Sequence, residues 1–309
     1  MSAPAVTPDD VEAAAARIGP LIRRTPVIED GGVLLKLELL QHAGSFKPRG
    51  AANRVLLARE RGELPRAGLV TASGGNHGAA LAHVGRALGL DVEVFVPSTS
   101  PELKHRRIRD LGASVHTVEG YYNQAQAAAE LRRQESGALL VHAFDHPDTV
   151  AGQGTMAREL DRQAGGYDTL VIAVGGGGFI AGQAAWVRDR IRVVAVEPES
   201  TDCLGAALRA GHPIDVQVGG LAADSLGARR IGEVPWGVVR RFVDQAVTVP
   251  DEEIRGAQRY LWDALRLIVE PGGAAALAAV RTGAYRPAPG ERVVVAVCGS
   301  NADPSTIVD

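Results

Sequence analysis

The feature that most constrains the fold of this chain is a regular alternation of apolar runs, glycine-containing turns and helical stretches between residues 68 and 143. The short apolar runs are rich in Val and Leu, and we interpret them as strands at 69–72, 92–96, 114–118 and 139–142. Strands that alternate with helices run parallel and are joined by right-handed crossovers. This stretch therefore predicts an α/β unit with a parallel sheet.

A second α/β unit is predicted further along the chain. We expect strands at 33–38, 170–174, 192–197 and 293–297, and helices at 8–18, 157–163, 178–187, 252–267 and 272–280. Residues 205–241 contain several Gly and Pro, which predicts long loops there. The length of 309 residues is sufficient for two medium-sized domains with substantial cores.

Composition and charge exclude several function classes. The net charge is −3 and aromatic residues make up 4% of the chain, which does not favour nucleic-acid binding. No apolar run reaches the ~20 residues that span a bilayer, and the N-terminal residues lack the apolar core of a signal peptide. We therefore expect a cytoplasmic protein without a membrane or nucleic-acid partner, and no appended regulatory domain.

A lysine is predicted at the start of a helix. Pro48 suits the first helical position and Ser45 is a candidate N-cap, which places Lys47 at the positive end of the helix dipole. This potential disfavours the charged amine, and a neutral lysine amine is a Schiff-base nucleophile. The alternative interpretation is a surface lysine at a frayed helix end.

Four consecutive glycines, Gly175, Gly176, Gly177 and Gly178, separate a predicted buried strand from a helix. Backbone N–H groups at a helix N-terminus bind anions, and glycines permit close approach, so this loop predicts a phosphate site. The alternative is a tight turn without a ligand.

The same glycines allow a second interpretation. Gly176, Gly178 and Ala181 match the GxGxxA fingerprint of dinucleotide-binding proteins, and Glu197 follows about twenty residues later. This pattern would indicate an NAD-binding oxidoreductase. It would place the fingerprint late in the chain and leave Lys47 without a role.

Two further strand ends carry polar residues. The segment Ser73, Gly74, Gly75, Asn76 and His77 lies between a strand and a helix, and predicts an anion site suited to a carboxylate. His77 has an equally reasonable role as a packing residue.

Cys298 and the residues up to Asn301 follow the strand at 293–297, where ligands bind in open α/β sheets. A buried apolar role for Cys298 is the alternative. The only other cysteine is Cys203, and no CxxC spacing is present, so neither a disulfide framework nor a structural zinc site is expected.

Taken together, these motifs resemble the fold-type II pyridoxal-phosphate enzymes, specifically the serine/threonine dehydratase and serine racemase group. The resemblance rests on four segments in this order, Ser45–Gly50, Ser73–Gly78, Gly175–Gly178 and Cys298–Asn301. Residues 144–147, 152–155 and 269–271 add further matches. The resemblance implies two open, mostly parallel twisted sheets with flanking helices, similar to the tryptophan synthase β chain.

The resemblance also implies roles around a pyridoxal 5′-phosphate cofactor. Lys47 would bond to the cofactor aldehyde, with Phe46 beside the ring, Asn76 at the ring hydroxyl and Cys298 facing the pyridine nitrogen. The glycines 175–178 would hold the phosphate. Residues 73–77 would hold the substrate carboxylate.

The implied reaction is β-elimination of L-serine, L-threonine or a related β-hydroxy amino acid to a 2-oxo acid and ammonia. The released Lys47 amine would remove the Cα proton. Racemases of this group carry a serine as a second base at the position of Gly74, so the missing side chain favours elimination. The alternatives are a serine racemase, a β-replacement enzyme, or a non-catalytic cofactor carrier.

The racemase-like members also bind a divalent cation through two acids and a main-chain carbonyl. Glu197 matches the first acid and Thr201 the carbonyl donor, whereas the second acid falls at Cys203. Hard cations prefer oxygen ligands, so we expect no conventional Mg²⁺ site unless the neighbouring Asp202 compensates.

The resemblance implies a domain organisation as well. Residues 1–48 and 144–309 would form a large cofactor-binding domain, and residues 49–143 a small one. The active site would lie in the cleft between them, and the expected assembly is a homodimer.

Overall fold

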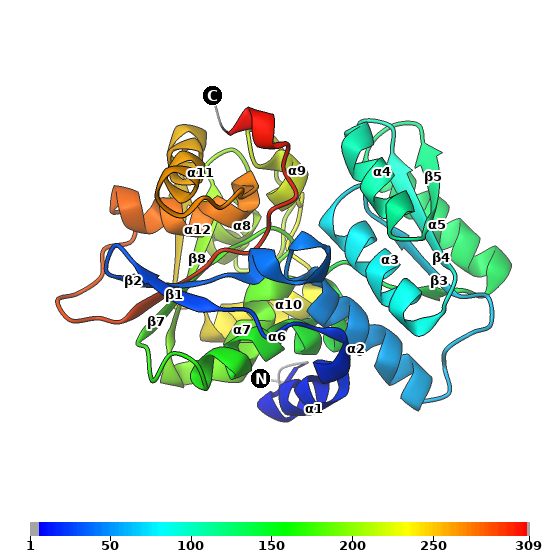
Figure 1. The fold of residues 1–309 in the computed structure, drawn as a ribbon, viewed down its shortest axis with the longest axis horizontal. Helices are drawn as coiled ribbons and strands as arrows, with labels where there is room; N and C mark the ends of the chain where they lie inside the picture. The colour runs from blue at the N-terminus through cyan, green and yellow to red at the C-terminus, as the bar shows by residue number, and fades with distance from the viewer. Residues whose placement is uncertain (1–5, 308–309) are drawn as a thin grey trace.

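The computed structural model describes residues 6–307. Residues 1–5 and 308–309, which include part of the stretch used to argue against a signal peptide, lie outside the described residues. Two lobes, each built on one sheet, lie side by side (Figure 1). No helix within residues 6–307 is both long enough and apolar enough to cross a membrane.

The smaller lobe contains a four-stranded parallel sheet of order β5-β4-β3-β6. Its strands are β3 (Leu69–Ala72), β4 (Val92–Pro97), β5 (Ser114–Val118) and β6 (Leu139–Leu140). The connecting helices are α3 (Asn76–Leu88), α4 (Glu102–Asp110) and α5 (Tyr122–Ser136). The predicted alternation of strands and helices is confirmed here.

The larger lobe contains a six-stranded sheet of order β1-β2-β10-β7-β8-β9. Its strands are β1 (Val27–Asp30), β2 (Val33–Lys36), β7 (Thr169–Ala173), β8 (Arg192–Pro198), β9 (Gln245–Val249) and β10 (Val293–Ala296). All neighbours are parallel except the β1–β2 hairpin. Neither β1 nor β9 was among the strands predicted from the sequence. The hairpin turns at Gly31 and Gly32, both at positive φ, so this glycine pair was an available signal for β1.

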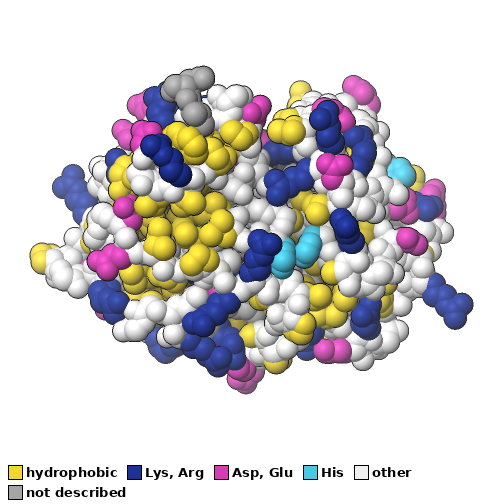
Figure 2. All heavy atoms as spheres, in the orientation of Figure 1, with side chains coloured by type: hydrophobic (Ala, Val, Ile, Leu, Met, Phe, Trp, Pro, Cys, Tyr) yellow, Lys and Arg dark blue, Asp and Glu magenta, His cyan; other side chains and the backbone are white. Residues whose placement is uncertain are grey.

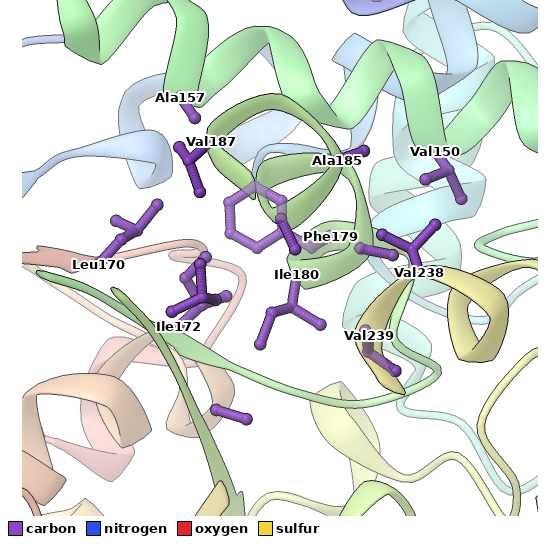
Figure 3. Packing of buried hydrophobic residues seen from close by; sticks show 14 of the residues in the cluster. Val150, Ala157, Leu170, Ile172, Phe179, Ile180, Ala185, Val187, Val238 and Val239 are labelled. Carbon is purple, nitrogen blue, oxygen red and sulfur yellow. The ribbon is translucent and has the colours of Figure 1, made fainter. Parts of the chain in front are cut away.

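Helices cover both faces of the large sheet. One layer contains α1 (Pro8–Ile18), α6 (Pro147–Asp161), α7 (Gly178–Val187) and α10 (Glu233–Phe242), and the other contains α11 (Asp251–Leu265) and α12 (Pro271–Thr282). Side chains of β7 alternate between the layers, with Leu170 and Ile172 facing α7 and Val171 and Ala173 facing α12. Figure 3 shows Ile172 packed near Ile180 of α7. This double covering buries the sheet and leaves only its ends for a site.

Two sequence predictions are wrong in extent. The helix expected at 157–163 begins at Pro147, because Gly152 and Gly154 are helical glycines required for close packing. A Cβ on Gly154 would lie 2.5 Å from the carbonyl oxygen of Gly182 on α7. The segment 205–241, predicted as long loops, also contains α10, α9 (Ala223–Leu226) and most of α8 (Cys203–Ala210).

The face seen in Figure 2 carries acidic and basic side chains interspersed over both lobes. A broad apolar area covers part of the larger lobe in the same view. This mixed charge agrees with the small net charge of the chain.

Candidate active site

A cavity of about 1220 Å³ lies between the two lobes. It is lined by residues that follow β3, such as Ser73, and by residues that follow β7, such as Gly175. The carboxyl ends of parallel strands are where ligands bind in open α/β sheets. The lining also includes Phe46, Lys47, Asn76 and Cys298, so the structure brings the predicted cofactor and carboxylate residues into one space.

Lys47 is the first residue of α2 (Lys47–Glu60) and lines the cavity. Its Nζ donates a hydrogen bond to the carbonyl oxygen of Ala143 at 3.0 Å. Burial lowers the pKa of Lys47 to about 8, although Cys298 and Glu270 oppose the change. A substantial fraction of the amine is therefore neutral near pH 8, as a nucleophile or base requires.

The predicted N-cap role of Ser45 is wrong. The N-cap position of α2 is Phe46, no side chain caps the helix, and the buried Ser45 Oγ has no hydrogen-bond partner. Ser45 instead forms an isolated antiparallel bridge with Gly299, and the N–H of Phe46 donates to the carbonyl oxygen of Cys298 at 3.2 Å. This pairing holds the residues before Lys47 against the end of β10.

Phe46 contacts the amine and the helix beyond the glycine loop. Its ring stacks on Phe179 of α7 with centroids 3.9 Å apart, and the Nζ of Lys47 lies 5.1 Å from its centroid. Phe46 therefore links the start of α2 to the start of α7.

The glycine loop 175–178 connects β7 to α7, and Gly177 adopts a left-handed φ of 85°. A Cβ on Gly176 or Gly178 would lie 2.5 to 2.7 Å from Phe144, and one on Gly177 would overlap Ile231. None of the four backbone N–H groups donates to another described residue. Free N–H donors at a helix start are suited to binding an anion, and we call this loop the glycine cradle.

The second loop leads from β3 to α3, whose N-cap is Gly75. The N–H of Gly75 donates to Ser73 Oγ at 3.3 Å, and a Cβ on Gly74 would overlap the side chain of Ser100. The His77 ring is buried, and its Nε2 bonds to the carbonyl oxygen of Val141 at 2.9 Å. Burial, aided by the charge of Lys47, lowers the pKa of His77 to about 3. The ring of His77 therefore packs as a neutral group, and only its backbone is available to the predicted anion site.

Asn76 belongs to a short series of hydrogen-bonded side chains that was not predicted from the sequence. Its Nδ2 donates to Glu270 Oε1 at 2.5 Å, and its Oδ1 accepts from Asn301 Nδ2 at 2.6 Å. Glu270 lines the cavity, its Oε2 is buried without a partner, and burial raises its pKa. The available signal was an acid directly before Pro271, the first residue of α12.

His142 also lines the cavity, and the sequence motifs did not predict it as a site residue. Its Nδ1 accepts hydrogen bonds from the N–H groups of Phe144 and Asp145, at 3.3 and 2.8 Å. A ring nitrogen that accepts two donors carries no proton, so the proton of the neutral ring is on Nε2. No distinctive spacing in the sequence identifies this residue.

Cys298 follows β10 and is buried at the cavity. Its Sγ donates to the carbonyl oxygen of Gly272 at 3.4 Å. Burial raises the pKa of the Cys298 thiol, with the carboxylate of Glu270 adding to the rise. The thiol is therefore a neutral group at physiological pH.

The three residues discussed for a cation do not line the cavity. Glu197 and Thr201 are buried at the end of β8, and Cys203 begins α8. Burial raises the pKa of Glu197 to about 7, although hydrogen bonds from two backbone N–H groups oppose the rise. These residues form a separate cluster behind the glycine loop.

The cavity fits a phosphorylated aldehyde cofactor. Its lining includes a lysine of lowered pKa, the glycine loop with its unpaired N–H donors, a neutral thiol and an asparagine. The family described as pyridoxal-phosphate dependent enzymes matches residues 18–299. The chain belongs to this family, and its cofactor is pyridoxal 5′-phosphate.

Three relatives show how similar the chain is to individual members of this family. A biosynthetic L-threonine dehydratase of Escherichia coli (strain K12) is 35% identical over 94% of this chain, and the match spans 57% of the dehydratase. A serine racemase of Arabidopsis thaliana is 34% identical, with 97% of this chain and 94% of the racemase covered. The structure of maize serine racemase superposes with a TM-score of 0.92 at 30% identity, covering 98% of this chain and 96% of the racemase.

The dinucleotide interpretation is wrong, because the family that matches the chain uses pyridoxal phosphate. The surroundings of Glu197, which would have bound the ribose in that interpretation, also argue against it. Glu197 is only 1% exposed, and its carboxylate accepts hydrogen bonds from the N–H groups of Leu204 and Gly205. It is therefore not available to a ribose hydroxyl.

Proposed function

We propose that the protein is an ammonia-lyase that eliminates the β-hydroxyl of L-serine, L-threonine or a related amino acid, yielding a 2-oxo acid and ammonia. When bound, pyridoxal phosphate withdraws electrons from the substrate Cα and makes its proton acidic. The residues of the chain must then hold the substrate, remove that proton and exclude competing reactions.

The observation that carries this proposal is the amine of Lys47. With a pKa of about 8 it is matched to accept a proton near neutral pH, and it lies at the cavity wall. Its hydrogen bond to Ala143 fixes the amine's direction. Gly74 offers no side chain that would return a proton from the opposite face, which supports elimination over inversion.

The loop 73–77 would bind the substrate carboxylate. It lies at the N-terminus of α3, a helix of 13 residues, where free N–H groups and the helix dipole both favour a negative charge. Cys298 would contact the pyridine nitrogen as a neutral group. A neutral partner does not stabilise a protonated ring as a carboxylate would, which disfavours a long-lived carbanion and again supports elimination.

Absorbance and product analysis test the proposal. The purified protein should show a violet absorption band that Lys47→Ala abolishes, and should release 2-oxo acids from a panel of serine, threonine and 3-hydroxyaspartate. A protein that keeps the band yet turns over none of these amino acids would instead be a cofactor carrier. A protein that stays colourless with added cofactor would contradict the proposal.

A serine racemase is the second candidate, and Ser100 is the observation that favours it. This side chain, from the loop after β4, occupies the space that a side chain on Gly74 would fill, and it lines the same cavity. It would supply a hydroxyl where Gly74 supplies none. Chiral chromatography of the products from L-serine decides between the two functions: D-serine as the main product, lost in Ser100→Ala, would establish racemisation.

The domain boundaries are also part of the proposal. The small sheet is formed wholly by strands within residues 69–140, and the large sheet by strands outside that range, which supports a small domain at 49–143. We further propose a cytoplasmic homodimer. The broad apolar area on the larger lobe in Figure 2 supports an interface there. Analytical ultracentrifugation tests the dimer.

A further inference from the structure

The end of β8 carries the residues for which the family resemblance implies a divalent cation, but their surroundings do not fit one. Both carboxylate oxygens of Glu197 are engaged, with Oε1 accepting from Leu204 N at 2.7 Å and Oε2 from Gly205 N at 2.8 Å. A cation on these oxygens would displace two donors and leave them unpaired in a buried place.

Two oxygen-bearing side chains nearby, those of Thr201 and Asp202, are engaged as well. The hydroxyl of Thr201 donates to the carbonyl of Gly219 at 3.3 Å and accepts from its N–H at 3.2 Å. Asp202 accepts from Arg209 Nη2 at 2.5 Å. Among residues 6–307, no group of three or more His, Cys, Asp and Glu side chains is arranged to hold a metal ion.

The contacts that replace the cation connect two loops. The N–H groups that donate to Glu197 belong to the first turn of α8, where a carboxylate also complements the helix dipole. Cys203, the first residue of α8, donates its thiol hydrogen to the carbonyl oxygen of Gly175 at 3.2 Å. Gly175 begins the glycine cradle, and β7 and β8 are parallel neighbours. One continuous series of contacts therefore runs from Glu197 through α8 to the cradle.

We propose that Glu197 and Cys203 are positioning residues that fix the glycine cradle without a bound cation, so that this protein holds its cofactor independently of Mg²⁺ and Ca²⁺. Glu197 anchors α8, and Cys203 on α8 holds the first glycine of the cradle. The proposal rests on the family's cofactor and not on the proposed elimination. Its failure would therefore leave the proposed function untouched, and the reverse also holds.

The first test uses the wild-type holoenzyme. We expect its thermal midpoint to stay within about 1 °C, and its cofactor dissociation constant within about twofold, between EDTA and millimolar MgCl₂ or CaCl₂. The dissociation constant comes from the violet band on stepwise dilution. A stabilisation of more than about 3 °C by either cation, or loss of the cofactor in EDTA, would overturn the proposal.

The second test asks whether the missing acid at position 203 contributes to the exclusion of the cation. Cys203→Asp adds an oxygen ligand beside Glu197 and should gain a thermal shift of about 3 °C or more with CaCl₂, whereas the uncharged Cys203→Asn should gain none. Equal responses in the two variants, or none in Cys203→Asp, would overturn the exclusion by Cys203. If Cys203→Asp does not fold, the wild-type titration still decides.

The third test separates positioning from general packing. Cys203→Ala removes the donor to Gly175 and should weaken cofactor binding about threefold or more, while Cys203→Ser keeps a donor and should restore it. The thermal midpoints of the cofactor-free proteins should differ little. Equal cofactor affinities in the Ala and Ser variants would show that the contact with Gly175 has no positioning role.

Discussion

Lys47 owes its chemistry to its surroundings. The residues before it are paired with the end of β10, and its amine is enclosed between the lobes, so burial lowers its pKa to about 8. The hydrogen bond to Ala143 then fixes where the amine points. Enclosure and direction together support the proposed role of this amine as a nucleophile.

The pH dependence of cofactor capture tests this assignment. Only the neutral amine reacts, so the capture rate of the cofactor-free protein should rise about eightfold between pH 6.5 and pH 7.5 and level off above about pH 8. Stopped-flow absorbance measures the rate. A rate that climbs tenfold per pH unit up to about pH 10 would indicate an unperturbed lysine.

His77 gives a prediction about stability. The pKa of His77 is lowered to about 3 in the folded protein, whereas an unfolded chain has a histidine pKa of about 6.5. Below pH 6.5 the unfolded chain therefore binds more protons at this residue than the folded protein does. The contribution of His77 to the free energy of unfolding is therefore fully present above about pH 6.5 and is lost on acidification. The loss is about 2 kcal/mol at pH 5 from this residue alone. Urea unfolding at pH 7 and pH 5 measures the loss, which should be smaller in His77→Gln. Equal losses would rule out His77 as the cause.

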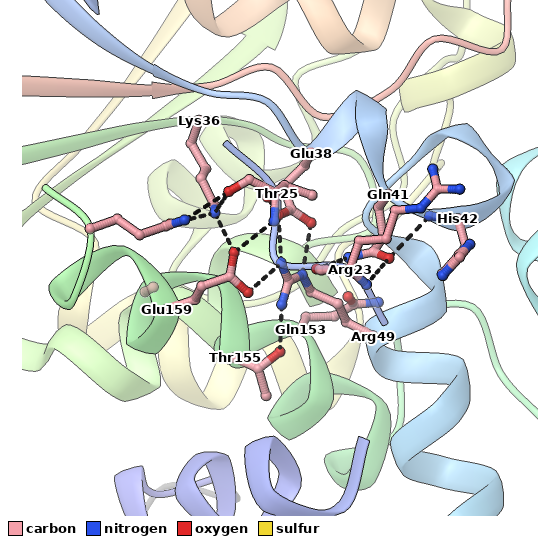
Figure 4. A network of polar contacts seen from close by, with 12 residues as sticks. Arg23, Thr25, Lys36, Glu38, Gln41, His42, Arg49, Gln153, Thr155 and Glu159 are labelled. Atoms are coloured by element: carbon pink, nitrogen blue, oxygen red, sulfur yellow. Dashed lines mark hydrogen bonds and ion pairs between the residues drawn. The ribbon is translucent and has the colours of Figure 1, made fainter. Parts of the chain in front are cut away.

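At the scale of elements, the start of α2 is fixed by a buried ionic network (Figure 4). Arg49 donates to both oxygens of Glu38 at 2.7 Å and to Glu159 of α6 at 3.1 Å. Lys36 of β2 donates to the same Glu159 at 2.5 Å. Burial would raise the pKa of Glu38, but Arg49 and Lys36 outweigh it and lower that pKa. The network joins β2, α2 and α6 two residues from Lys47.

Arg49→Met should therefore destabilise the protein strongly. It would leave the fully buried Glu38 without its main partner, at a cost of about 3–5 kcal/mol. Arg109→Met is the control, because its pair with Glu102 is exposed to solvent and such pairs contribute little to stability. Chemical denaturation compares the two. Similar losses in both variants would contradict an organising role for the network.

At the scale of the whole molecule, the cavity depends on how the two lobes meet. Lys104 of α4 in the smaller lobe forms an ion pair with Asp224 of α9 in the larger lobe, and Asp224 lines the cavity. The pair therefore joins the lobes beside the site. A single half-exposed pair contributes little to overall stability. We expect its effect to fall on the separation of the lobes, because it is a direct ion pair between them.

Lys104→Met should increase amide hydrogen exchange in α4 and α9 and raise the KM for substrate a few-fold with little change in kcat. Added salt should have the same effect on the wild type, since partly exposed pairs are screened. The unfolding free energy should change by less than about 1 kcal/mol. Unchanged exchange and KM would mean that the pair does not hold the lobes together.

Local sequence signals determined most of the architecture. The alternation of apolar runs and glycine turns predicted the parallel strands, and the predicted bounds of α1, β3 and β5 agree with the structure. These elements follow from backbone propensity and burial period, which act over a few residues. The cofactor family also followed from the sequence, because each glycine loop and the lysine lie in local motifs.

Only the tertiary structure decided which distant residues share the site. Glu270 meets Asn76 across 194 positions, Ser100 occupies the space beside Gly74, and Cys203 holds Gly175. Ser45 was predicted as a helix cap from its local context, but it forms a β-bridge with Gly299 instead. The physical reason is common to all four. Each partner follows a different strand or begins a different helix, and only the packed sheets bring those ends together.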